Sequence, residues 1–132
     1  MPSASPRTVL IVDDSPQMAA NLEIALTAGS EFEVEVVASA KEALALLGRA
    51  GCQIAAIVTD LEMPRMNGYE LIEILRKNPK WALTPIIVSS GTVDPDAPAR
   101  AERLGANAYF TKPYSPIKLR KMLSALLEGA KT

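Results

Sequence analysis

The chain has 132 residues, of which 48% are hydrophobic and 22% charged, values typical of a single globular domain. Fourteen basic and fifteen acidic residues give a formal net charge of −1, which disfavours binding to nucleic acid or to an anionic membrane surface. The absence of histidine and the single cysteine exclude histidine-based triads, imidazole zinc sites and an internal disulfide.

Strand patterns and helix patterns alternate along the chain. The strand patterns are short apolar or valine-rich runs bounded by turn residues, and in chain order they cover 8–12, 32–38, 54–59, 85–88 and 108–111. The helix patterns between and after them begin near Pro16, Ala40, Tyr69, Pro95 and Pro116. Five strands alternating with five helices predict an α/β fold with a doubly wound parallel sheet covered on both faces.

Capping residues mark the helix starts. Ser15 and Ser115 each precede a proline and predict N-caps, while Ser39 followed by Glu42 predicts a capping box.

The fourth helix pattern contains two prolines near its start. If Asp94 is the N-cap, Pro95 and Pro98 both fall in the first turn and remove no helical hydrogen bond, so a short helix is expected.

The remaining segments predict one domain at 7–128, with a flexible lead at 1–6 and a tail at 129–132. No apolar run approaches the roughly 18 residues of a membrane helix, and the first residues lack a secretory pattern. We therefore expect a cytoplasmic protein with no membrane contact.

Polar residues follow the predicted strands at their carboxyl ends. Asp13 and Asp14 follow the first strand, Asp60 the third, Ser90 the fourth and Lys112 the fifth. Ligands of open parallel sheets bind at this rim, so we expect these side chains to meet there.

Three carboxylates within about 5 Å would repel by roughly 3 kcal/mol per pair at an effective dielectric near 20. Lysine neutralises part of this charge, and a hard divalent cation with oxygen ligands, Mg²⁺, suits the remainder. Acids, a cation and a lysine form a clamp for a phosphoryl group, and one of the aspartates could be the nucleophile.

Four stretches, VDDS at 12–15, DLEMPRMNG at 60–68, SSG at 89–91 and YFTKPY at 109–114, resemble the receiver domain of bacterial two-component response regulators. The resemblance covers roughly residues 7–128. It implies a flavodoxin-like sheet with strand order 2-1-3-4-5, similar to chemotaxis regulators, and a signalling protein rather than an enzyme with a separate substrate.

The resemblance also implies roles for individual residues. It makes Asp60 the acceptor of a phosphoryl group, and Asp13, Asp14, Asp60 and the backbone carbonyl of Glu62 the ligands of Mg²⁺, for which Mn²⁺ could substitute. Lys112 would pair with the phosphoryl oxygens. A switch would consist of the Ser90 hydroxyl and the ring of Tyr109.

By the same resemblance, the partners are a histidine kinase or a histidine phosphotransfer protein, which docks on the first helix near Met18, Asn21 and Leu22. Output would run through a downstream protein that binds the fourth helix, the fifth strand and the last helix. No nucleic acid contact is expected, and the chain would be a monomer or a weak, phosphorylation-dependent dimer.

Three alternatives stay open. The chain could be a docking module that never carries phosphate, or a small phosphohydrolase with Asp60 as nucleophile and Glu62 as general acid. It could also be a fragment of a larger regulator, although a stand-alone receiver is favoured.

Overall fold

The computed structural model describes residues 7–29 and 31–129, so the predicted lead at 1–6 and residues 130–132 of the predicted tail at 129–132 lie outside the described residues. Gly129, the first residue of that tail, is the last residue of the final helix. Strands and helices alternate as predicted. In chain order the elements are β1 (Arg7–Val12), α1 (Pro16–Thr27), β2 (Phe32–Val37), α2 (Ala40–Leu47), β3 (Ala56–Thr59), α3 (Gly68–Lys77), β4 (Ile86–Ser90), α4 (Ala97–Leu104), β5 (Ala108–Thr111) and α5 (Pro116–Gly129).

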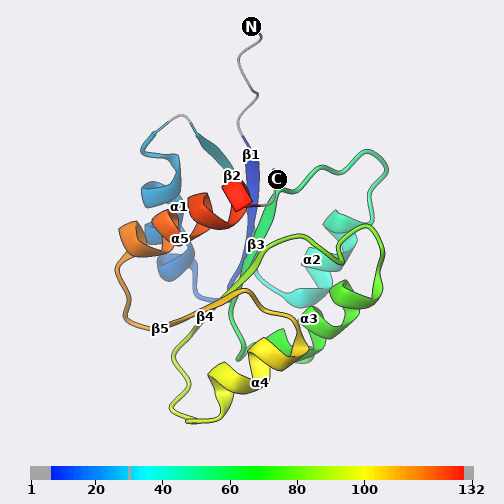
Figure 1. Ribbon diagram of the computed structural model, residues 1–132, viewed down its shortest axis with the longest axis vertical. Helices are drawn as coiled ribbons and strands as arrows, with labels where there is room; N and C mark the ends of the chain where they lie inside the picture. Colours follow the sequence, from blue (N-terminus) through cyan, green and yellow to red (C-terminus); the bar gives the residue numbers. More distant parts are fainter. Residues whose placement is uncertain (1–6, 30, 130–132) are drawn as a thin grey trace, which may run out of the picture.

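The five strands form one parallel sheet in the order β2-β1-β3-β4-β5, which confirms the predicted fold. Helices α1 and α5 cover one face, and α2, α3 and α4 cover the other (Figure 1). The central strands β1, β3 and β4 are almost entirely buried, as expected for parallel strands with helices on both sides.

Two apolar cores fill the space between the sheet and its helices. Side chains of one strand alternate between them, so Leu10 packs under α2 and α3 while Ile11 packs under α1 and α5. Each helix contributes only one stripe to a core. On α3 that stripe is Leu71, Ile72 and Leu75.

Several element boundaries differ from the predicted ones. β4 continues through Ser89 and Ser90, because both pair with β5 opposite Phe110 and Thr111. β3 begins at Ala56, two residues later than predicted, and β2 ends one residue earlier, at Val37. Shifts of one or two residues are usual at the ends of elements.

The predicted N-cap of the fourth helix is wrong. The Asp94 carboxylate accepts a hydrogen bond from the Asp96 N–H at 2.9 Å and closes a turn, so the N-cap is Asp96. Pro95 therefore precedes the helix, and only Pro98 lies in its first turn. The helix is short, as expected, with eight residues.

The other predicted caps lie where the sequence places them. The Ser15 and Ser115 hydroxyls accept from the N–H groups of Met18 and Lys118. Ser39 accepts from the Glu42 N–H, but the Glu42 carboxylate accepts from the Ser39 hydroxyl, so this motif differs from the reciprocal capping box that was predicted. The reciprocal box occurs instead between Asn67 and Glu70 at the start of α3.

One arginine joins three segments on the α3–α4 side. The Arg76 guanidinium donates to the carbonyl oxygens of Gly105, Trp81 and Ala82 at 2.8–3.2 Å and to Asn107 Oδ1 at 3.0 Å. Burial lowers the pKa of Arg76. The carbonyl groups that accept its hydrogen bonds stabilise the buried charge. Removal of the guanidinium group would leave several of these acceptors without a donor.

We therefore expect Arg76→Ala to lower the free energy of unfolding by about 2–3 kcal/mol in urea denaturation, because several acceptors lose a charged donor. Lys77→Ala is the matched control, because the Lys77 side chain is 77% exposed and its ion pair with Glu73 spans 3.7 Å. That control should change stability by less than about 0.5 kcal/mol. Equal effects of both substitutions would contradict the role given to Arg76.

Candidate functional site

The third strand leads directly into a buried aspartate. Asp60 is 7% exposed, and its N–H donates to the carbonyl oxygen of Val12 at 2.9 Å. Asp60 Oδ1 accepts from the N–H groups of Leu61 at 2.7 Å and Glu62 at 3.3 Å. The loop after the strand thus fixes this carboxylate through its own backbone, as aspartate does readily in turns.

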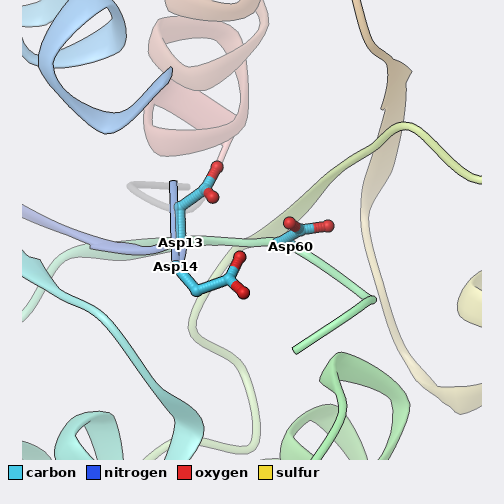
Figure 2. A group of neighbouring side chains, drawn as sticks. All are labelled: Asp13, Asp14 and Asp60. Atoms are coloured by element: carbon cyan, nitrogen blue, oxygen red, sulfur yellow. The ribbon is translucent and has the colours of Figure 1, made fainter. Parts of the chain in front are cut away.

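Two further carboxylates come from the end of the first strand. Asp13 is buried, and its Oδ1 accepts from the Ser15 N–H at 2.9 Å, whereas Asp14 is exposed. One carboxylate oxygen each from Asp13, Asp14 and Asp60 lies within 4.8 Å of the others (Figure 2). The predicted crowding of acidic groups is therefore present.

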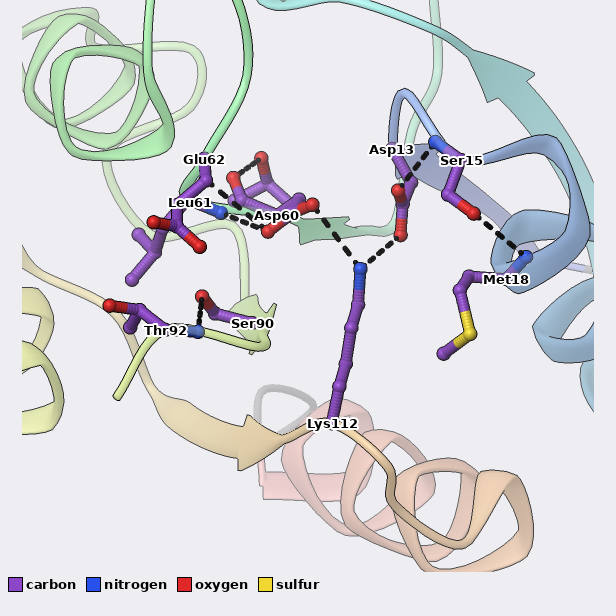
Figure 3. Close-up of polar contacts among 10 residues, drawn as sticks. Asp13, Ser15, Met18, Asp60, Leu61, Glu62, Ser90, Thr92 and Lys112 are labelled. Carbon is purple, nitrogen blue, oxygen red and sulfur yellow. Dashed lines mark hydrogen bonds and ion pairs between the residues drawn. The ribbon is translucent and has the colours of Figure 1, made fainter. Parts of the chain in front are cut away.

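A lysine from the end of β5 reaches into this cluster. Lys112 Nζ lies 2.9 Å from Asp13 Oδ2 and 3.2 Å from Asp60 Oδ2, and its side chain is 15% exposed (Figure 3). Three carboxylates and one ammonium group leave two formal negative charges without a counter-charge. The atoms of this cluster that could bind a metal ion are all carboxylate oxygens, the ligands that hard divalent cations such as Mg²⁺ prefer. The residues therefore fit such a cation.

The ionisation of the cluster reflects this imbalance. Burial raises the pKa of the Asp60 carboxyl, the charge of Lys112 opposes that effect, and the charge of Asp13 adds to it, with a net increase. Burial lowers the pKa of Lys112, but its hydrogen bond to Asp13 and the charge of Asp60 outweigh burial, so that pKa is raised. The lysine therefore stays charged, and a further cation would stabilise ionised Asp60.

A hydroxyl and a phenol lie on the strands next to Asp60. Ser90, the last residue of β4, is fully buried, and its Oγ accepts from the Thr92 N–H at 3.1 Å (Figure 3). Tyr109 on β5 is half-buried; burial raises the pKa of its phenol, and the nearby Ser90 hydroxyl lowers it, with a net increase. The two side chains thus interact at the rim that carries Asp60.

The sequence of the chain matches the response regulator receiver domain over residues 9–124. This match spans most of the chain and includes both aspartates after β1, Asp60, Ser90 and Lys112. The chain belongs to the response regulator receiver family.

Similarity to individual proteins supports this family assignment. The receiver domain is 34% identical over 127 residues to the two-component response regulator ORR11 of Oryza sativa, with 93% of this chain and 82% of that protein covered. Its fold superposes with a TM-score of 0.85 on a putative response regulator from Chloroflexus aurantiacus, at 32% identity over 93% of this chain and 98% of the other. The signal receiver domain of a histidine kinase from Syntrophus aciditrophicus gives a TM-score of 0.84 at 31% identity, with 95% and 92% covered.

Receiver domains also occur within longer proteins. The whole of this chain aligns, at 32% identity, with 29% of a probable cyclic di-GMP phosphodiesterase of Vibrio cholerae.

Among the described residues, no helix is both long and apolar enough to cross a membrane.

The structure brings most of the predicted site residues of this receiver domain to one rim of the sheet: Asp13, Asp14, Asp60, Ser90, Tyr109 and Lys112. The Glu62 N–H donates to Asp60, whereas a role of its carbonyl oxygen as a metal ligand stays a prediction.

The predicted partner surface on α1 needs one correction. Leu22 is 2% exposed because it packs into the core under α1 and α5. Asn21 is exposed and Met18 half-buried, so these two residues remain available for contact.

Gly68, the last residue of the stretch at 60–68, lies directly against the backbone of Asp60. A Cβ on Gly68 would clash with the backbone carbonyl oxygen of Asp60 and would lie 2.8 Å from Leu61 Cα. The Gly68 N–H also donates to the Leu61 carbonyl at 2.9 Å. The Asn-Gly pair in the sequence signals a turn, but this close backbone approach depends on the fold.

We expect Gly68→Ala to destabilise the receiver domain by about 2 kcal/mol or more, because backbone atoms on both sides must move. Gly91→Ala is the matched control at the same rim, since its new Cβ would meet only Lys112 Cβ, at an ordinary 3.9 Å. Chemical denaturation of both variants measures the difference. A Gly68→Ala variant as stable as the control would show that the loop accommodates a side chain at Gly68.

Proposed function

We propose that the receiver domain accepts a phosphoryl group on Asp60 from a histidine of a partner kinase or phosphotransfer protein. The geometry of Asp60 carries this proposal. Its Oδ1 is held by two backbone N–H groups, its Oδ2 lies 3.2 Å from Lys112, and two further carboxylates stand beside it. A carboxylate held in this way at the sheet rim is suited to nucleophilic attack on phosphorus.

Asp13, Asp14 and Asp60, with the backbone carbonyl of Glu62, would hold Mg²⁺, and Mn²⁺ could take its place. When bound, the ion supplies positive charge that allows an anionic donor to approach an anionic nucleophile. The two uncompensated charges of the cluster and its all-oxygen donor set support this assignment.

In the transfer, an oxygen of Asp60 forms a bond to phosphorus while the bond between phosphorus and the donor nitrogen breaks, and the electron pair returns to the imidazole. The Lys112 ammonium lies at hydrogen-bonding distance from Asp60 and would stabilise charge on the phosphoryl oxygens. The buried Ser90 hydroxyl would donate to the same oxygens. Because these 132 residues contain no histidine, the donor histidine lies outside this sequence.

The product would act as a switch. A phosphoryl group adds about −1.5 to −2 charges next to Lys112 and Ser90, which favours one of two arrangements that differ by a few kcal/mol. The interaction of Ser90 with Tyr109 would carry the change to the surface of α4, β5 and α5, where a downstream protein binds. The α1 surface around Asn21 and Met18 would receive the donor.

We expect Asp60→Asn to abolish covalent labelling by radiolabelled acetyl phosphate and magnesium, because the amide lacks a nucleophilic oxygen anion. Asp96→Asn, an exposed acid outside the cluster, is the matched control and should label like the unmodified chain. Peptide mass spectrometry locates the label.

Each possible outcome assigns the chain to one class. Stable label on Asp60 supports the receiver, an unlabelled chain supports a docking module, and repeated turnover of phosphoesters supports a phosphohydrolase. Equal labelling of the Asp60→Asn chain would overturn the site assignment.

A second prediction concerns the balance of charge. Without magnesium, Lys112→Met should lower the free energy of unfolding by about 2–3 kcal/mol, because two buried carboxylates lose their cation. Magnesium should recover much of this loss, so it should stabilise the variant more than the unmodified chain. Thermal unfolding with and without magnesium tests this, with exposed Lys118→Met as control. If magnesium stabilised all three chains equally, Lys112 and the ion would not share the same carboxylates.

A further inference from the structure

Strand β4 ends in two serines whose side chains point to opposite faces of the sheet, as successive strand residues do. Each serine lies close to a tyrosine on its own face of the sheet. Ser90 interacts with Tyr109, which packs against the core under α2, α3 and α4. On the other face, Ser89 lies close to Tyr114, which packs against the core under α1 and α5.

The Ser89 hydroxyl is in an unfavourable environment. Ser89 is 2% exposed, and within the described residues its Oγ is the one buried side-chain polar atom without a hydrogen-bond partner. It nevertheless lies close enough to the Tyr114 phenol to lower the pKa of that group, which burial raises overall. A buried hydroxyl without a hydrogen-bond partner is unfavourable. A small movement that formed a hydrogen bond between Ser89 and Tyr114 would therefore be favourable.

Tyr114 connects the site with the last helix. It follows Lys112 by two residues, and the charges of Lys112, Asp13 and Asp60 reach its phenol. Its ring packs edge-on against Phe110, with ring centroids 5.8 Å apart. The next residue, Ser115, caps α5. A shift of Tyr114 would therefore move the start of α5.

Helix α5 is in turn tied to α1. Arg120 on α5 donates to the Ala25 carbonyl of α1 at 3.5 Å, and Ser124 on α5 donates at 3.3 Å to the carboxylate of Glu31, the residue before β2. Figure 1 shows the two helices together on one face of the sheet. A contiguous set of contacts thus runs from the end of β4 through Tyr114 and α5 to α1.

We propose that phosphorylation of Asp60 closes a hydrogen bond between Ser89 and Tyr114, and that this pair reports the phosphorylated state to the surface of α1 and α5. The proposal rests on the proposed function of Asp60. Ser90 and Ser89 are adjacent in one strand, so a movement of Ser90 toward a phosphoryl group displaces both. The α4 side and the α1 side would therefore receive the signal through separate serine–tyrosine pairs.

This second pair has a consequence for the phosphodonor. The α1 surface is the one on which the donor is expected to dock. A change there after transfer would distinguish the phosphorylated from the free receiver and favour release of the spent donor.

The test uses beryllofluoride with magnesium as a phosphoryl mimic and amide NMR spectra of the full chain. In Tyr114→Phe and Ser89→Ala, the shift changes along α1 and α5 should fall to less than about half of those in the unmodified chain, while those along α4 persist. Tyr109→Phe is the matched control and should show the reverse pattern. The double variant should behave like either single variant, because each removes the same hydrogen bond.

Two results would count against the proposal, and they differ. If beryllofluoride binds all variants and the changes along α1 and α5 are undiminished in Tyr114→Phe and Ser89→Ala, the second pair carries no signal and Asp60 keeps its role. If beryllofluoride and magnesium leave the spectrum of the unmodified chain unchanged, the proposed function of Asp60 fails, and the second pair fails with it.

Discussion

The site depends on the close approach of three carboxylates that share one ammonium group. Lys112 Nζ bonds Asp13 and Asp60 at 2.9 and 3.2 Å, so within the described residues no cation pairs with Asp14 and the cluster keeps two negative charges in excess. Such crowding is unfavourable in a buried environment: burial raises the pKa of Asp60, Lys112 opposes the increase, and the charge of Asp13 adds to it. Backbone N–H groups offset part of this cost by binding Oδ1 of both buried aspartates, and a divalent cation would offset the rest.

The topology of the sheet makes this arrangement possible. β1 lies beside β3 at the centre of the sheet, and the strand order changes direction there, so the loops after both strands meet at one rim. Lys112 reaches the same rim from β5 across β4, although it is 99 residues from Asp13 and 52 from Asp60 in sequence. Charged groups from distant segments are thus forced together by apolar packing below them.

The sequence was sufficient to predict the sheet, its helices and the residues of the rim. The central strands β1 and β3, for example, are apolar runs followed directly by an aspartate, and both features are local. The strand order and the roles of the individual site residues follow from the resemblance to receiver domains, because the alternation of strands and helices alone allows several strand orders. The structural features that the sequence patterns do not predict depend on contacts between segments distant in the sequence.

Particular residues show which features local sequence patterns cannot predict. Ser89 and Ser90 read as a strand end, but pairing with β5 extends the strand through both. Leu22 reads as a partner contact, but the packing of α1 buries it. Gly68 lies against the Asp60 backbone, and Arg76 bonds a loop 29 residues away; neither contact leaves a local pattern. Arg65 takes a left-handed conformation, with φ of 73°, where glycine would be expected.

The most direct test of the account is a calorimetric titration of magnesium into the unmodified chain and into Asp14→Asn. Asp14 is exposed, and its proposed role is that of a metal ligand. We expect one saturable site in the unmodified chain and at least about tenfold weaker binding in the variant, because one unit of negative charge next to the ion is lost. If the unmodified chain takes up no magnesium at millimolar concentration, or both chains bind it equally, the carboxylate cluster is not a metal site.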